Sequence, residues 1–208
     1  MRDQALAFAA MRKADETLSG LPEWLWDGES LPVPIETIAD SHFGLLVRDV
    51  SDIAGKLTVG RHGWDHLSGA LIVDRREIWV DAEEARDWPR RRRFTIAHEL
   101  GHWVLHRDGG SAVHCRSTSV HAPDPGPVPA VLAVTHDAVE DEANFFGGAL
   151  LMPPRLLRRH HARLGGDREA LCDLFDISPS AYGTRYAVHM RAQVHLDFAE
   201  FDDRPGAD

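Results

Sequence analysis

FTIAHELGHWVLH, residues 94–106, decides how the rest of this chain is interpreted, because it spaces three histidines at intervals of four. In an α-helix, residues four apart lie on one face about one turn (~6 Å) apart, so the imidazoles of His98 and His102 can converge on one zinc ion. Glu99 lies on the flank of that face, where it is no ligand but can act as a general base toward a water molecule at the metal. His106 lies a further turn along the axis, too far to share the ion, and we expect it to contact a ligand or to pack beside one.

The residues around the two histidines are uncharged, which favours a buried helix over a histidine-rich surface helix. Gly101 stands between the histidines. A glycine inside a helix costs about 1 kcal/mol relative to alanine, a cost that is reasonable where another backbone must approach closely.

A catalytic zinc site needs one more protein ligand and an open position for water. The candidates lie in HDAVEDEANFFGGALLMP, residues 136–153. Helical periodicity puts Glu140 on the apolar side of this segment, with Ala143 and Phe146, and puts Asp141 more toward solvent. Glu140 is therefore the expected third ligand.

Two alternatives to this assignment stay open. Glu142 can be the ligand instead of Glu140, or Glu140 can close a capping box with Asp137 at the start of the helix. Asn144, one turn beyond Glu140, is placed to form a hydrogen bond with a ligating histidine.

Composition restricts the class of protein. The 208 residues carry a formal net charge of −10 with a pI near 5.7, which argues against a general phosphate-binding surface, and the run Arg90–Arg93 is expected to pair with acidic neighbours at a helix end. Cys115 and Cys172 form no CxxC pair, so neither a disulfide framework nor a cysteine-zinc site is expected. No segment has the ~20 apolar residues of a membrane span, and no signal peptide is recognised. We expect a cytoplasmic protein.

Periodicity predicts one α+β domain whose core forms where the central helix packs on a small sheet. We expect an N-terminal helix and connector (1–31), a metallopeptidase domain (32–195) with a helical C-terminal part (154–195), and a polar tail (196–208). Within the domain the expected elements are a helix over 34–43, strands at 45–50 and 55–60, a hairpin at 69–81, the long helix from 87–89 to 108, a loop over 108–136, and helices at 138–151, 154–163, 167–175 and 179–195.

Four segments together resemble the ImmA/IrrE family of metallo-endopeptidases: RRRFTIAHELGHWVLH (91–106), EDEANFFGGALLMP (140–153), PVPIETIADSHFG and SGALIVDRREIWVD. The resemblance implies a zincin-like fold, in which a small twisted sheet packs on the HExxH helix and a helical half follows. It also implies a zinc site formed by His98, His102 and Glu140, with Glu99 as the catalytic acid and base.

The chain departs from the family pattern in two places. Gly147 and Gly148 stand where the family usually has alanines, which we expect to loosen the helix. Residues 1–31 are too short for the helix-turn-helix domain of many members, so direct binding to nucleic acid is not expected.

The resemblance implies a regulatory protein as substrate, typically a helix-turn-helix repressor whose cleavage derepresses stress or mobile-element genes. We expect the substrate to add an extended strand to the sheet edge, for which Ile78–Val80 is the candidate. The alternative is a non-proteolytic anti-repressor or toxin–antitoxin-type binding module that uses the same fold. The intact Glu99 argues against this alternative, because a pure binder needs no general base.

Overall fold

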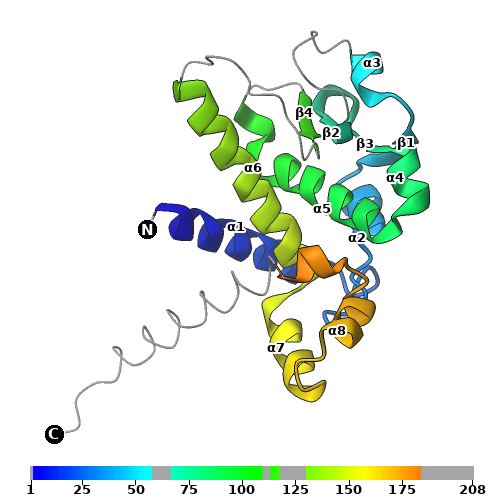
Figure 1. The fold of residues 1–208 in the computed structure, drawn as a ribbon, viewed down its shortest axis with the longest axis vertical. Helices are drawn as coiled ribbons and strands as arrows, with labels where there is room; N and C mark the ends of the chain where they lie inside the picture. The colour runs from blue at the N-terminus through cyan, green and yellow to red at the C-terminus, as the bar shows by residue number, and fades with distance from the viewer. Residues whose placement is uncertain (1, 58–66, 110–112, 118–129, 184–208) are drawn as a thin grey trace, which may run out of the picture.

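The computed structural model describes residues 2–57, 67–109, 113–117 and 130–183 (Figure 1). The longer helices are α1 (Arg2–Ser19), α5 (Pro89–His106), α6 (Ala130–Leu151), α7 (Pro154–Arg163) and α8 (Arg168–Phe175). The shorter ones are α2 (Ile35–Thr37), which continues as a π-helical turn (Ile38–His42), α3 (Ile53–Leu57) and α4 (Ala82–Asp87). The strands are β1 (Leu46–Val50), β2 (Leu67–Ile72), β3 (Glu77–Asp81) and β4 (Val113–Ser117). The expected α+β class is confirmed.

The four strands form one mixed sheet in the order β1-β3-β2-β4. The hairpin expected over 69–81 is present: β2 and β3 pair antiparallel around a short 3-10 turn, after which Arg76 adopts the left-handed conformation with φ of 54°. β1 pairs parallel with the other side of β3, and β4 pairs antiparallel with β2.

The expectation that Ile78–Val80 lies at a sheet edge is wrong. These residues belong to β3, which is covered on both sides by β1 and β2. The edges of the described sheet are β1 and β4. Strand order is a non-local property, because β1 reaches β3 from a segment far earlier in the chain.

The strand expected over 55–60 is also wrong for its described part, since Ile53–Leu57 form α3. Asp52, with φ of 52°, precedes this helix, and its carboxylate accepts a hydrogen bond from the backbone nitrogen of Gly55 at 3.0 Å. This local cap favours a helical turn over an extended strand. Residues 58–60 lie outside the described part of the chain.

The loop expected over 108–136 contains regular structure at both ends. Val113–Ser117 form β4, and α6 begins at Ala130, eight residues before the expected helix start at 138. Residues 118–129 lie outside the description, as do the expected tail and all of the last expected helix beyond residue 183. Residues 179–183 of that helix are helical.

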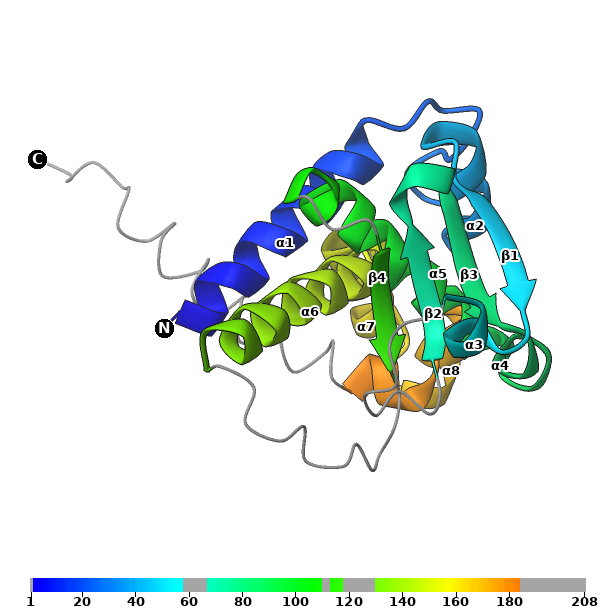
Figure 2. The same cartoon turned by 90° about the horizontal axis from the view of Figure 1, so that it is seen from above.

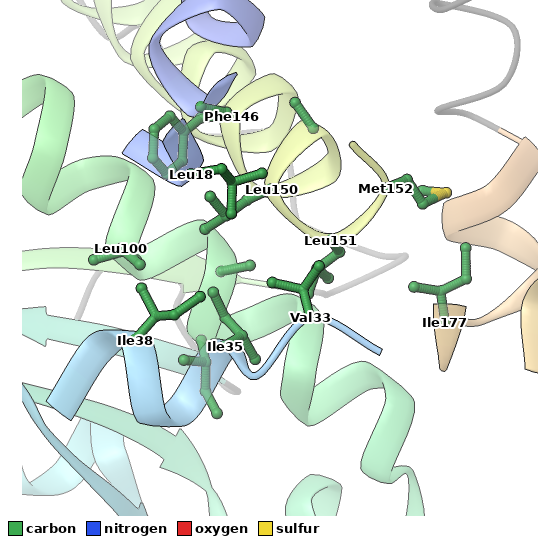
Figure 3. Packing of buried hydrophobic residues seen from close by; sticks show 14 of the residues in the cluster. Leu18, Val33, Ile35, Ile38, Leu100, Phe146, Leu150, Leu151, Met152 and Ile177 are labelled. Atoms are coloured by element: carbon green, nitrogen blue, oxygen red, sulfur yellow. The ribbon is translucent and has the colours of Figure 1, made fainter. Parts of the chain in front are cut away.

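The elements stack in layers, with α5 between the sheet and α6, and α6 between α5 and α1 (Figure 2). The larger of two hydrophobic clusters joins these layers. It contains Leu100 of α5, Phe146 and Leu150 of α6, and Ile35 and Ile38 from the α2 segment (Figure 3). These five side chains are 0–1% exposed. The core thus fixes the position of α5 relative to α6.

The arginine run at the start of α5 pairs with acidic neighbours, as expected. The ion pairs are Arg90 and Arg93 with Asp176, Arg91 with Glu84, and Arg92 with Glu36 and Asp49. The side chains of Arg92 and Arg93 are only 18% and 17% exposed, so they connect elements across the fold.

Candidate metal centre

Helix α5 brings His98, Glu99 and His102 into the interior, where all three side chains are 0% exposed. The Nε2 atoms of His98 and His102 lie 3.0 Å apart, as the spacing of four in a helix predicts. Two imidazole nitrogens therefore face one point inside the protein.

Glu140 of α6 completes this group. Its two carboxylate oxygens lie 3.2 Å from His98 Nε2 and 3.2 Å from His102 Nε2. The candidate ligand atoms of the three residues all lie within 4.8 Å of one another, a group that could hold a metal ion. The capping-box alternative for Glu140 is contradicted, because α6 begins at Ala130 and Asp137 lies within the helix.

Glycines let α5 and α6 approach closely enough for this meeting. A Cβ atom on Gly101 would lie 3.1 Å from Cα of Ala143, and one on Gly147 would lie 3.0 Å from the backbone nitrogen of His98. The close approach expected at Gly101 is therefore present. Gly147 does not loosen α6, which continues to Leu151, but provides a second contact point with α5.

The orientation of His98 is set from α6. Its Nδ1 atom lies 3.0 Å from Oδ1 of Asn144, the hydrogen bond expected from the sequence. Because an amide oxygen only accepts, Nδ1 carries the proton and the Nε2 lone pair faces the candidate site.

His106 and Glu142 lie beside the group rather than in it. The Nδ1 atoms of His106 and His102 are 3.1 Å apart, and His106 Nε2 lies 2.9 Å from Oε2 of Glu142. His106 thus contacts a candidate ligand, as expected. Glu142, the alternative ligand expected from the sequence, is hydrogen-bonded to His106 instead.

The protonation state of the group suits a metal. Burial lowers the pKa of His102 to about 4, with the neighbouring imidazoles adding to the effect against the opposing influence of Glu140. Burial alone would raise the pKa of Glu140, but the close ring nitrogens of His102 and His98 outweigh it and hold that pKa well below its usual range. At neutral pH His102 is therefore neutral and Glu140 ionised, the forms in which these residues bind metals.

This donor set fits a catalytic zinc ion. Two imidazoles and one carboxylate are a known catalytic zinc set that leaves a coordination position for water. The set also accepts other divalent transition metals.

Glu99 lies against the sheet at a glycine that sequence reasoning missed. A Cβ atom on Gly69 of β2 would lie 3.0 Å from Oε1 of Glu99 and 2.3 Å from Cγ2 of Thr95. The sheet therefore makes room for the Glu99 carboxylate by omitting a side chain. The position of Gly69 inside the apolar run of β2 was the available signal, because glycine in a strand often marks a close approach.

His114 of β4 was also missed. Its ring stacks on that of His102, with the centroids 4.6 Å apart and the planes inclined by 18°. The glycines and prolines of residues 108–136 predict a loop, although the alternation of Val113, His114 and Cys115 is a short strand signal. Of the two cysteines, Cys172 is a buried free thiol, and the side chain of Cys115 lies outside the description.

Comparison with known proteins identifies the family of the chain. The family model Peptidase M78, described as an IrrE N-terminal-like domain, matches residues 42–186, more than half of the chain. The chain belongs to this family. The fold expected from the ImmA/IrrE resemblance is confirmed, because the α+β arrangement around α5 is that of the zincin-like M78 fold.

Among solved structures, the M78 chain is similar to a Mycobacterium tuberculosis transcriptional regulator, with a TM-score of 0.49 and 22% sequence identity. The similarity covers 85% of this chain and 45% of that one, so the chain spans less than half of that regulator's length. No match is found among the curated proteins. No helix in the described part of the chain is long and apolar enough to cross a membrane.

Proposed function

We propose that the protein is a zinc-dependent endopeptidase that hydrolyses a peptide bond in a regulatory protein. His98, His102 and Glu140 hold the zinc ion. The observation that carries this proposal is the meeting of these side chains within 4.8 Å in a buried space, in a member of a peptidase family. A partly buried carboxylate held against two buried imidazoles has the arrangement of a functional site such as a metal centre.

A zinc ion held by this set supplies Lewis acidity, which lowers the pKa of water and polarises a carbonyl group. Glu99 accepts the proton of the attacking water and delivers it to the leaving amine. Glu99 follows His98 on α5, so its side chain leaves the helix on the flank of the face that carries the two histidines. Its burial against Gly69 keeps the carboxylate in a fixed position.

The substrate binds as an extended strand along β4. β4 is an edge of the described sheet and lies on its α6 side (Figure 2), and its residue His114 stacks on His102. An added strand here forms backbone hydrogen bonds that are independent of sequence, while pockets for alternate side chains give specificity. β4 is proposed in place of β3 as the binding edge, because β3 pairs with β1 on one side and with β2 on the other.

The substrate we propose is a helix-turn-helix repressor, because the sequence resembles peptidases that act in transcription regulation and stress response. We propose a cytoplasmic site of action, since the chain has only two cysteines and Cys172 is a free thiol.

The test compares Glu99→Gln and His98→Ala with the wild type, using bound metal and cleavage of a candidate repressor as readouts. Glu99→Gln should keep the metal and lose cleavage by about 10²–10⁴-fold, the range of general-base catalysis. His98→Ala should lose both. Cleavage by Glu99→Gln at the wild-type rate would refute the mechanism. Repressor binding without any fragment, by a metal-loaded wild type, would favour the non-proteolytic anti-repressor.

A further inference from the structure

We propose that Glu142 and His106 form a hydrogen-bond relay that orients His102 toward the metal and strengthens it as a ligand. Both are positioning residues, because neither belongs to the group of candidate ligand atoms. The inference rests on the proposed metal site. It assigns a role to the two residues on the side of His102 that faces away from the candidate metal position.

The direction of the relay follows from the chemistry of its ends. The carboxylate of Glu142 can only accept, so the proton between it and His106 lies on His106 Nε2, 2.9 Å away. The Nδ1 atom of a neutral His106 then carries a lone pair and accepts from Nδ1–H of His102, 3.1 Å away. With its proton on Nδ1, His102 presents the Nε2 lone pair to the candidate metal position that it shares with Glu140 and His98. One carboxylate therefore selects the metal-binding tautomer of His102 through an intervening imidazole.

The two candidate histidine ligands are thus oriented by different means. Nδ1–H of His98 donates directly to the neutral amide oxygen of Asn144. Nδ1–H of His102 donates to His106, which in turn donates to the negatively charged carboxylate of Glu142. A carboxylate behind a ligating histidine raises the basicity of the ligand as well as fixing its ring.

Burial makes the relay effective. His102 is 0% exposed, while the side chains of His106 and Glu142 are 12% and 27% exposed. The hydrogen bond at the ligand lies in the protein interior, where it is electrostatically stronger than in water, and the charged end reaches the periphery, where its desolvation costs least.

His114 supports the same orientation from another side. Its ring stacks on the face of His102 at 4.6 Å and lies 6.2 Å from that of His106. A stacked ring resists tilting of His102 but does not select a tautomer, because stacking on the ring face does not depend on which nitrogen carries the proton. The relay therefore has a task that packing alone does not perform.

The experiment measures zinc affinity by competition with a chromogenic chelator and the ligand field by the visible spectrum of the cobalt-substituted protein. The variants are His106→Leu, Glu142→Leu and their double mutant, with Asp141→Asn as the matched control that removes an exposed carboxylate one residue away. His106→Leu should weaken zinc binding by about 10–100-fold, the usual effect of losing the partner of a ligating histidine. It should also shift the cobalt spectrum. Asp141→Asn should bind zinc like the wild type.

The double mutant decides whether Glu142 acts through His106. In the wild type, Glu142→Leu should weaken zinc binding, whereas in the His106→Leu background it should add no further loss. His106→Gln should recover part of the affinity, because its amide can donate toward Glu142 and accept from His102 while leucine can do neither.

Three outcomes overturn the relay in a wild type that binds zinc: a wild-type affinity in His106→Leu, losses that multiply in the double mutant, or equal affinities for the glutamine and leucine variants at position 106. A wild-type chain that binds no metal would overturn the proposed function as well, so the two failures are distinguishable. If His106→Leu does not fold, as judged by circular dichroism, His106→Gln and the more peripheral Glu142→Leu decide the question by the same measurements.

Discussion

Gly147 of α6 packs against the backbone of His98 on α5, so closely that a Cβ atom on the glycine would lie 3.0 Å from the His98 nitrogen. The atoms it meets belong to the backbone of a buried helix, which cannot rotate away as a side chain can. Glu140 and Gly147 lie on the same helix, two turns apart. The separation between α5 and α6 therefore sets the distance from Glu140 to the histidines.

We predict that Gly147→Ala destabilises the protein and weakens metal binding. Overpacking costs about 1–3 kcal/mol, and the gain in helix propensity offsets about 1 kcal/mol, so we expect a net loss of up to about 2 kcal/mol. Denaturant unfolding and zinc competition measure the two effects. Gly109→Ala is the control, because a Cβ atom there would have no neighbour within 4 Å, and we expect it to be neutral. If the Gly147→Ala variant is more stable than the wild type and binds zinc equally well, the close packing of α6 on α5 at this position does not control the metal site.

Glu140 is the carboxylate whose removal should empty the candidate site. Glu140→Gln keeps the shape but removes the charge, and amides are weaker ligands for zinc-like ions. We predict a loss of zinc affinity larger than the 10–100-fold typical of a residue behind a ligand. Elemental analysis of the purified variant beside the wild type measures it. Asp141→Asn, which removes a neighbouring exposed carboxylate, should retain the metal. Stoichiometric zinc in Glu140→Gln would remove Glu140 from the ligand set.

Local helical periodicity explains what the sequence could predict of this site. His98 and His102 are one turn apart on α5, and Glu140 and Asn144 are one turn apart on α6. Each pair needs only the geometry of a single helix. That the two helices meet at these pairs could be anticipated from Gly101, whose cost in a helix calls for a close neighbour.

The parts that escaped prediction depend on distant segments. The order of strands cannot be derived from periodicity, so the sequence predicts an edge for the segment of β3 and a loop for the segment of β4. His114 reaches His102 only because β4 pairs with β2 beside α5. The contact between His106 and Glu142 joins two helices 36 residues apart in sequence, and no local pattern encodes it.

Arg92 connects three elements and should give a pH-dependent contribution to stability. Its guanidinium forms a hydrogen bond with Asp49 at 2.8 Å and lies within 3.1 Å of both carboxylate oxygens of Glu36. The bond with Arg92 lowers the pKa of Glu36, with burial opposing. A lowered pKa in the folded state means that the unfolded carboxyl binds its proton at higher pH. The stabilisation is therefore present above the unfolded pKa and is lost as pH falls through the folded pKa.

We predict that Arg92→Met costs about 1 kcal/mol at pH 7, a value reduced for solvent screening because Glu36 is half exposed. The difference from the wild type should shrink as the pH is lowered toward 3. Arg12→Met is the control, because Arg12 is 79% exposed and pairs with Glu16 on the same helix. It should change stability little at either pH. If Arg92→Met loses the same free energy of unfolding at pH 7 and at pH 3, the loss comes from packing of the aliphatic part of the Arg92 side chain and not from its ion pairs.

Gly69 should tolerate no side chain unless Thr95 is shortened at the same time. A Cβ atom at position 69 would lie 2.3 Å from Cγ2 of Thr95 and 3.0 Å from Oε1 of Glu99. Thr95 is fully buried, and its branched side chain has few rotamers to adopt on a helix. We predict that Gly69→Ala lowers the free energy of unfolding by about 1–3 kcal/mol, the usual cost of overpacking, and also lowers peptidase activity by displacing Glu99.

Thr95→Ser separates these two effects, because serine lacks Cγ2 but keeps the hydroxyl group. In the double variant Gly69→Ala/Thr95→Ser, the clash at 2.3 Å is removed while the contact with Glu99 remains. The free energy of unfolding should then return most of the way to the wild-type value. The effects of the two substitutions on stability should therefore be strongly non-additive. Activity should recover less than stability, since the new methyl group still presses on the Glu99 carboxylate. Additive losses of stability would show that the strand shifts as a whole, in which case the distance between β2 and α5, rather than the Thr95 side chain, limits what can stand at position 69.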